Sequence, residues 1–252
     1  MKIIGSIQAR VGSTRFPGKV LKEICGKPML LWQVERIKRS RLLDDIIVAT
    51  TLNPRDDEIV KLCKKHDIKF FRGSENDVLK RISALIKLFK IDTHVEFLGD
   101  SPLPDAHIID EIIGFYLKYR DKYDYVSNAL KITYPPGMDV SVFKGAALIT
   151  VDRKVPKDEP LREHLSLHII RDKRYKKYNL EAPDYHRFPD ISLEVDTPED
   201  FKLISNIVNY FTNRGEDYFS LTQILGYLKQ NKDLLEINKG IPRRWKKFKE
   251  GQ

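Results

Sequence analysis

Cysteine is scarce in this chain, which contains only Cys25 and Cys63, far apart in the sequence. This scarcity excludes a disulfide framework and a Cys-x-x-Cys redox or zinc motif, and it favours a reducing compartment. Long apolar runs are absent too, since none approaches the roughly 18 residues needed to span a bilayer. The N-terminus does not follow the pattern of a secretory signal peptide. We therefore expect a cytoplasmic protein without a membrane partner.

Internal repeats and low-complexity linkers are also missing, and acidic residues are in the minority. The 252 residues include 45 Lys and Arg against 36 Asp and Glu, for a formal net charge of +9. This balance suits a nucleic acid, a membrane surface or a polyanionic small ligand, and it does not choose among them. Without a break in composition, we expect a single domain over residues 1–252.

The apolar pattern alternates regularly between two periods along most of the chain. Strands are expected at 2–8, 45–51, 68–72, 94–98, 123–127 and 191–195, and helices at 28–40, 54–66, 77–90, 105–120 and 198–212. This alternation predicts an α/β fold with a mostly parallel sheet and helices on both faces. From about 130 to 190 the pattern is irregular, which we interpret as an insertion, and a helical tail is expected at about 215–252.

The loop after the first strand reads QARVGSTRFPGK (8–19) and leaves the edge of a parallel sheet where ligands bind. It brings its backbone close to a ligand and supplies N–H and hydroxyl donors at Gly12, Ser13, Thr14 and Gly18. Its cations are Arg10, Arg15 and Lys19. Such a set suits a polyphosphate. The loop has neither the Walker spacing nor the GxGxxG fingerprint. A solvated loop that only connects strand to helix is the competing interpretation.

The same stretch resembles the signature of the cytidylyltransferases that make CMP-activated acidic sugars, which reads approximately ARxxSxRxPxKxL. Ala9, Arg10, Ser13, Arg15, Pro17, Lys19 and Leu21 match it. The chain is more similar still to the SpsF-like branch, whose opening IQARxGSTRLPGKVL differs here only at Phe16. Further matches follow in order: GKPML (26–30), IIVATT (46–51), GSENDVLKR (73–81), GDSPL (99–103), DYVSN (124–128), YPPGMDV (134–140), REHL (162–165) and VDTPED (195–200).

The resemblance implies a single Rossmann-like domain of the nucleotide-diphospho-sugar transferase type, commonly a homodimer, whose insertion serves the acceptor or dimerisation. In such an enzyme an acceptor oxygen attacks the α-phosphorus of CTP and expels pyrophosphate, usually with Mg²⁺ held by carboxylates. The resemblance makes Asp100 and Asp196 the aspartates that bind Mg²⁺, with Mn²⁺ as an alternative. Both follow predicted strands. Asp196 could instead cap the next helix, and Asp100 could be a plain turn residue.

The resemblance also implies which residues would bind the nucleotide and which would bind the acceptor. Lys19 and Arg10 would hold the triphosphate and act in catalysis with the two aspartates, while Arg15 is a weaker candidate. The nucleotide site would comprise Gln8, Ala9, Arg10, Gly12, Ser13, Thr14, Arg15, Lys19, Arg72, Gly73, Ser74 and Asp77. The acceptor site would comprise Gly137, Asp139, Arg162, Glu163 and His164. Asp77 is equally well placed to cap the helix that follows it.

Two other patterns have alternative meanings. His164 and His168 lie one helical turn apart, a spacing that can hold zinc, but no third ligand of matching spacing is evident. The basic tail at 242–249 has aromatic residues among its cations, as nucleic-acid binders do. A frayed, solvated terminus is the favoured interpretation, so we expect no nucleic-acid partner.

Glu96 and Ser192 stand where the family commonly has arginine. Losing two cations weighs against an acceptor sugar that carries a 2-keto carboxylate. The favoured function is a cytidylyltransferase that acts on CTP and a small acceptor in surface-glycan biosynthesis. A nucleotidyltransferase of the same fold with a phosphorylated acceptor is the second hypothesis. A catalytically silent nucleotide-binding homologue is the third, against which the retained Asp100, Asp196 and Lys19 speak.

Overall fold

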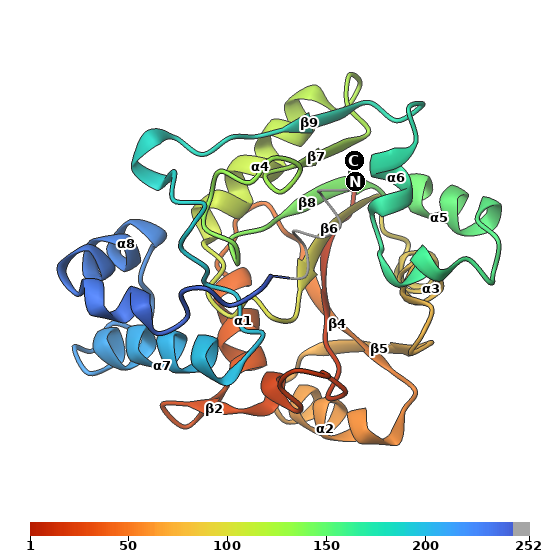
Figure 1. Cartoon of the computed structure of the whole chain (residues 1–252). Coiled ribbons are helices and arrows are strands. Elements are labelled where there is room, and N and C mark those ends of the chain that lie inside the picture. The colour runs from red at the N-terminus through yellow and green to blue at the C-terminus, as the bar shows by residue number, and fades with distance from the viewer. Residues whose placement is uncertain (244–252) are drawn as a thin grey trace.

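A mixed sheet forms the centre of the computed structural model, which describes residues 1–243 (Figure 1). Its strands are β1 (Ile3–Gln8), β4 (Asp45–Thr51), β5 (Lys69–Gly73), β6 (Thr93–Leu98), β7 (Tyr125–Ser127), β8 (Ser141–Lys144) and β9 (Lys177–Asn179). They lie in the order β5-β4-β1-β6-β8-β7-β9, and a separate hairpin pairs β2 (Glu23–Ile24) with β3 (Lys27–Pro28). Only β8 runs antiparallel to its neighbours in the sheet of the described chain. The expectation of a mostly parallel sheet is confirmed.

Helices connect the strands much as the apolar spacing predicts. They are α1 (Met29–Ile37), α2 (Asp57–Lys65), α3 (Val78–Phe89), α4 (Ala106–Tyr119), α5 (Gly145–Lys154), α6 (Leu167–Arg171), α7 (Pro198–Thr212) and α8 (Leu221–Gln230). Local caps fix several starts. The side chain of Asp77 accepts a hydrogen bond from the Lys80 backbone N–H at the start of α3, and Asp105 does the same for His107 at the start of α4.

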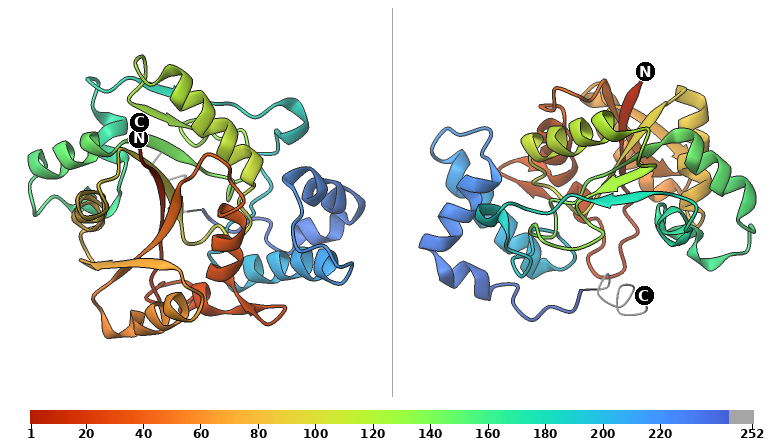
Figure 2. Two further views of the ribbon diagram at one scale, coloured as in Figure 1. Left: turned by 180° about the vertical axis from the view of Figure 1, so that it is seen from behind. Right: turned by 90° about the horizontal axis from the view of Figure 1, so that it is seen from above.

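Two hydrophobic cores lie on opposite faces of the sheet. Alternate side chains of β1 point to opposite sides, so Ile3 and Ile7 join one core while Ile4 joins the other. Residues of α1, α4, α7 and α8 build the first core, and residues of α3, α5 and α6 build the second. The two groups of helices are separated by the sheet in both ribbon views (Figure 2). Helices on both faces were predicted, and this is confirmed.

The expected strand at 191–195 is wrong. The segment is extended but lies outside the sheet, and its partners are loops. The Leu193 N–H donates to the Pro136 carbonyl, and the Val195 N–H donates to the Asp100 carbonyl, both at 2.7 Å. An apolar run of this length looks like a strand in sequence, but no neighbouring strand is present to pair with it.

The stretch from 130 to 190 contains more regular structure than its pattern suggests. It supplies β8, α5, α6 and β9, and β8 lies between β6 and β7 inside the sheet. Both strands are only three or four residues long, which is too short for a period to be read from sequence. In the helical tail, α8 is followed by a 3₁₀ helix at Lys232–Glu236. The expected tail beyond residue 243 lies outside the described residues.

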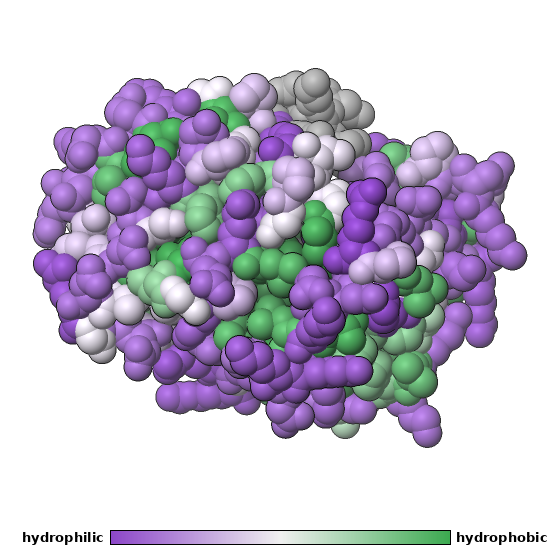
Figure 3. Space-filling model, turned by 90° about the horizontal axis from the view of Figure 1, so that it is seen from below, coloured by the Kyte–Doolittle hydropathy of each residue, from purple (hydrophilic) through white to green (hydrophobic). Residues whose placement is uncertain are grey.

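Polar side chains cover most of the surface. Seen from below, the molecule is largely hydrophilic, with apolar side chains gathered toward the middle of that face (Figure 3). Within residues 1–243, none of the helices combines the length and the apolarity that crossing a membrane requires.

Candidate active site

The first loop (8–19) leaves the sheet at the carboxyl end of β1, where the strand order reverses. Strand β1 lies between β4 and β6 and pairs in parallel with both. The carboxyl ends of these three strands therefore meet at one edge, with β4 and β5 on one side of β1 and β6 on the other. In open α/β sheets this point is the usual place for a ligand.

Internal hydrogen bonds hold this loop in a defined shape. The Val11 carbonyl accepts from the N–H groups of Ser13 (2.8 Å) and Gly18 (2.9 Å), so the loop folds back on itself. Gly18 has φ of +71°, a left-handed conformation that favours glycine. The Val11 N–H donates to buried Asp56, and the ring of Phe16 packs edge-on against Phe201 of α7. The loop is thus held to Asp56 through Val11 and to α7 through Phe16.

Lys19 lies at the centre of a cluster of charges. Its Nζ is 3.1 Å from Oδ1 of Asp196 and 3.8 Å from Oδ2 of Asp100, and it donates to the Val195 carbonyl at 2.5 Å. Arg15 forms a second ion pair with Asp196. Lys19 is only 8% exposed. The structure therefore brings together three of the four residues predicted for catalysis, from three distant segments.

Two backbone contacts place Asp100 beside Asp196. Gly99 continues the β1–β6 ladder because its N–H donates to the Gln8 carbonyl, where a Cβ would collide with that oxygen. The next residue, Asp100, accepts the Val195 N–H through its own carbonyl. Asp196 therefore reaches the site from a non-strand segment that is pinned to the end of β6, rather than from the end of a strand as expected.

The helix cap at the start of α7 is Thr197. Its side chain accepts from the Asp200 N–H, while Asp200 accepts from the N–H groups of Thr197 and Asp196, at 3.0 Å each. This is a capping box. The alternative that Asp196 is the cap is therefore wrong, and the Asp196 carboxylate faces Lys19 and Arg15 instead.

The buried position of Arg243 contradicts the interpretation of the basic segment at 242–249 as frayed and solvated from its start. Arg243 is 8% exposed, and its guanidinium binds both oxygens of Asp200, at 2.7 and 3.0 Å. Asn238 also donates to Asp200, and Arg15 donates to the Pro242 carbonyl. The end of the described chain therefore packs behind Asp196. The rest of the predicted basic tail, at 244–249, lies outside the described residues. The sequence carries no signal that pairs Arg243 with Asp200.

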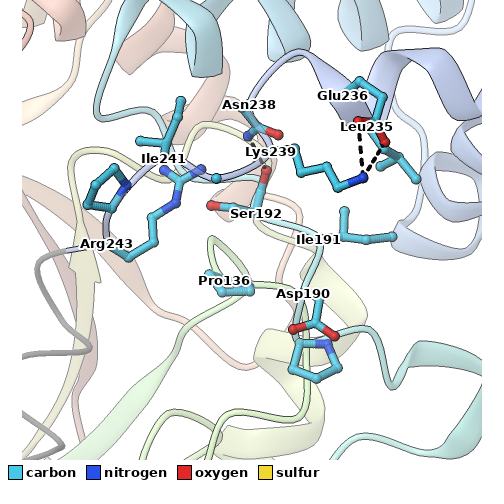
Figure 4. Close-up of a pocket in the computed structure, with 13 residues that line it drawn as sticks. Pro136, Asp190, Ile191, Ser192, Leu235, Glu236, Asn238, Lys239, Ile241 and Arg243 are labelled. Atoms are coloured by element: carbon cyan, nitrogen blue, oxygen red, sulfur yellow. Dashed lines mark hydrogen bonds and ion pairs between the residues drawn. The ribbon is translucent and has the colours of Figure 1, made fainter.

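A pocket of about 510 Å³ lies between this C-terminal segment and residues 189–192. Asn238 and Arg243 border it on one side, and Asp190 borders it on the other (Figure 4). Ser192 lines this pocket, and its carbonyl accepts from Asn238. Lys19, Asp100 and Asp196 do not line this pocket. Ser192, where the resemblance leads us to expect an arginine, therefore lies at this pocket.

Several buried or half-buried carboxyl groups lie close together at this centre. Burial raises the pKa of Asp100, as does the nearby Asp196, while Lys19 opposes the shift. Burial, together with Asp100, Asp139 and Asp196, raises the pKa of Glu194 to about 8 against the opposing effect of Arg243. Buried carboxyl groups that raise one another's pKa values favour the binding of added positive charge.

Asp100 and Asp196 fit a magnesium ion. Both carboxylates approach the same ammonium nitrogen within 4 Å, so they converge on one cationic position. Mg²⁺ is commonly held by one or two carboxylates together with water and substrate phosphates. No group of three or more His, Cys, Asp or Glu side chains in residues 1–243 is arranged to hold a metal. His164 and His168 therefore belong to no such group within these residues.

The turn after β5, predicted to face the nucleotide base, is built by internal bonds. Arg72 donates to the carbonyls of Thr51 (2.8 Å) and Asn53 (3.1 Å) and pairs with Asp57 (2.7 Å). A Cβ at Gly73 would lie 2.7 Å from the side chain of Arg81. These bonds fix the turn, and its contact with a base stays a prediction.

Asp77 caps α3 and also accepts from Nε of Arg162 at 2.9 Å. Arg162 is 3% exposed and pairs with Asp152 at 2.6 Å, and it donates to the Val155 carbonyl. The structure gives both residues a role in joining α3 to α5. Their predicted contacts with nucleotide and acceptor stay predictions.

Arg81 lies at the end of the GSENDVLKR stretch, and the sequence analysis assigns it no role. Its side chain is buried, donates to the Ser74 carbonyl and has no partner for Nε within the described chain. Burial, with a smaller contribution from nearby Arg10, lowers its pKa to about 10. Arg10 itself is exposed and forms no ion pair with residues 1–243. These two guanidiniums place positive charge beside the first loop.

The remaining predicted residues divide between the two sides of β1. Gln8 turns toward β6, where its Nε2 donates to Glu96 at 2.9 Å. Gly137 has φ of +102°, and a Cβ there would meet the Leu193 carbonyl carbon at 2.7 Å, so it permits close packing. Asp139 lies near Glu96, in a pocket described below. The other predicted positions occupy the first loop (Ala9, Gly12, Ser13, Thr14) and the REHL segment (Glu163, His164).

A mostly parallel sheet with a cationic loop and two neighbouring aspartates at its carboxyl edge is typical of nucleotide-binding α/β proteins. A family model described as cytidylyltransferase matches residues 4–241. The chain belongs to the cytidylyltransferase family, whose members are nucleotidyltransferases.

Individual relatives agree with this membership. An uncharacterized protein of Methanocaldococcus jannaschii is 37% identical over 251 residues, with 99% of each chain covered. The spore coat polysaccharide biosynthesis protein SpsF of Bacillus subtilis is 31% identical over 92% of this chain and 95% of its own. An 8-amino-3,8-dideoxy-manno-octulosonate cytidylyltransferase of Shewanella frigidimarina is 29% identical over 80% and 96%. The structure of a cytidylyltransferase from Leptospira borgpetersenii superposes with a TM-score of 0.87 at 29% identity, covering 96% of this chain and 100% of that one.

Proposed function

We propose that this protein is a Mg²⁺-dependent cytidylyltransferase that transfers CMP from CTP to an acidic sugar or a related acceptor in surface-glycan biosynthesis. The observation that carries this proposal is the convergence of Asp100 and Asp196 on Lys19 at the carboxyl edge of the sheet. The names of two relatives refer to polysaccharide synthesis and to an octulosonate acceptor. We also expect a homodimer that works in the cytoplasm.

In the proposed reaction, an acceptor hydroxyl oxygen forms a bond to the α-phosphorus of CTP. The bond from that phosphorus to the bridging oxygen breaks, pyrophosphate leaves, and the hydroxyl proton passes to solvent. The protein has little covalent chemistry to perform, so catalysis depends on positioning and on neutralising charge. Mg²⁺ held by Asp100 and Asp196 would neutralise charge on the triphosphate.

The cations of the first loop have a distinct part in this proposal. Lys19 and Arg15 already lie at the aspartate cluster, and Arg10 lies on the exposed side of the loop. Negative charge grows on the departing pyrophosphate, so a fixed ammonium there stabilises the transition state more than bound CTP. Arg81 and Arg10 would favour binding of the polyphosphate.

The test is pyrophosphate release from each of the four nucleoside triphosphates, with a panel of acidic sugars and phosphorylated metabolites as acceptors. We expect CTP to be preferred, EDTA to abolish activity, and Mg²⁺ or Mn²⁺ to restore it. Equal turnover of ATP and CTP would contradict the proposed nucleotide. Full activity in EDTA would contradict the metal assignment.

A further inference from the structure

A second, smaller pocket of about 150 Å³ opens beside β6, on the opposite side of β1 from β4. It is lined by Glu96, Leu98, Tyr125, Ala129, Leu130, Asp139, Ser141, Ser166 and Ile170. Glu96 lies in β6 and Asp100 lies four residues further on, in the turn directly after this strand, so their Cα atoms are separated by roughly 13 Å at most. The pocket is therefore within reach of a small acceptor whose other end lies at Asp100.

The lining has an acidic and hydroxyl-rich character. It includes two carboxyl groups, from Glu96 and Asp139, and hydroxyl groups from tyrosine and serine. The Tyr125 hydroxyl donates to Ser141 at 2.7 Å, which orients it within the pocket. Among the described residues that line this pocket there is no lysine, arginine or histidine.

Glu96 is a buried acid that the fold pairs with neutral groups. It is 8% exposed, accepts from the Gln8 amide at 2.9 Å and has no ion pair with any residue in 1–243. Burial raises the pKa of Glu96 to about 7, although hydrogen bonds from Ser166 and Gln8 lower it. A buried carboxyl group of this kind gains most from a ligand that brings positive charge.

We propose that this pocket binds an amino-bearing end of the acceptor, with Glu96 accepting hydrogen bonds from a protonated amine. This inference rests on the proposed function, because it treats the pocket as the acceptor half of that site. A hydroxyl group would make a weaker, neutral hydrogen bond at the same position. A carboxylate would face the carboxyl group of Glu96, so we expect it to bind least well.

The experiment measures binding without nucleotide, by calorimetry or saturation-transfer NMR, for three probes that differ at one terminal carbon. They are 6-amino-6-deoxyglucose, glucose and glucuronate, which differ only at carbon 6 and carry no 2-keto carboxylate. We expect the amine to bind about tenfold tighter than the hydroxyl compound, and the carboxylate to bind weakest. Glu96→Gln, which is isosteric, should abolish the preference for the amine. Glu58→Gln on the exposed face of α2 is the matched control and should keep it.

Equal binding of the amine and hydroxyl probes, tightest binding of the carboxylate, or no binding of any probe would overturn the inference. An amine preference that survives in Glu96→Gln would overturn the role of that residue. Circular dichroism verifies that each variant is folded. Pyrophosphate release from CTP is measured in parallel: its absence with every acceptor contradicts the proposed function, while the binding series still decides the chemistry of the pocket.

Discussion

Substitution of Lys19 by alanine tests the centre of the site. The change removes the ammonium that lies 3.1 Å from Asp196 and 3.8 Å from Asp100. Removing one partner of a buried ion pair typically costs about 3–5 kcal/mol. Asp196 keeps Arg15 and the Asp100 side chain is 26% exposed, so we expect the lower end of that range. A loss of about 3 kcal/mol corresponds to a fall in Tm of about 6–12 °C for a chain of this size.

Two measurements separate the structural and catalytic parts of this effect. Thermal unfolding with and without Mg²⁺ should show that the metal recovers more Tm in Lys19→Ala than in the wild type, because it replaces the lost positive charge. Steady-state kinetics should show a lower kcat as well as a higher KM for CTP, since the interaction strengthens in the transition state. Lys19→Arg should restore activity only in part, because the planar guanidinium does not fit the place of a compact ammonium.

Lys22→Ala is the matched control for Lys19→Ala. Lys22 is exposed on the same segment, where its ammonium lies over the ring of Phe16. Its loss should change stability by no more than about 0.5 kcal/mol and leave the kinetics unchanged. Wild-type Tm and kinetics for Lys19→Ala would refute the assignment of the loop as a phosphate cradle, and the predicted role of Arg10 with it.

Three further substitutions test neighbouring parts of the site. Asp196→Asn should lower kcat by orders of magnitude while the protein still folds, and an unchanged kcat would argue against its predicted metal role. Thr197→Ala should cost about 1 kcal/mol in urea denaturation and spare kcat. Arg243→Met should cost about 3–5 kcal/mol, because it leaves the fully buried Asp200 unpaired, and a loss below about 1 kcal/mol would argue against this network. In the folded wild type the Glu96 carboxyl group has a pKa of about 7, whereas in the unfolded chain it loses its proton near 4.5. The wild type therefore loses stability as pH rises from 5 to 8, and Glu96→Gln does not. The free energy of unfolding of Glu96→Gln should rise relative to wild type by up to about 3 kcal/mol over this range. A constant Tm difference across that pH range would show that Glu96 titrates normally.

Local sequence determined the elements of the first half of the fold and the start of α7. The apolar run at 45–51 forms β4 over the same residues, and the helix expected at 198–212 is α7. These predictions succeed because side-chain periodicity and capping act within a few residues of each other. The composition of the first loop likewise identified Lys19 and its neighbours, since small residues and cations concentrated at a strand end have a chemical meaning without knowledge of the fold.

Tertiary structure decided which of these residues meet. The Asp100 carbonyl and the Val195 N–H form a hydrogen bond across nearly a hundred residues of chain, and that bond brings Asp196 to Lys19 although 191–195 is no strand. The position of β8 inside the sheet and the pairing of Arg243 with Asp200 are likewise contacts between distant segments. A single sequence records the residue types in such pairs, but the pairing follows from which surfaces the folded chain buries together. The chemistry of the site was therefore present in the sequence, while its geometry, including the acidic pocket beside Glu96, came from long-range packing.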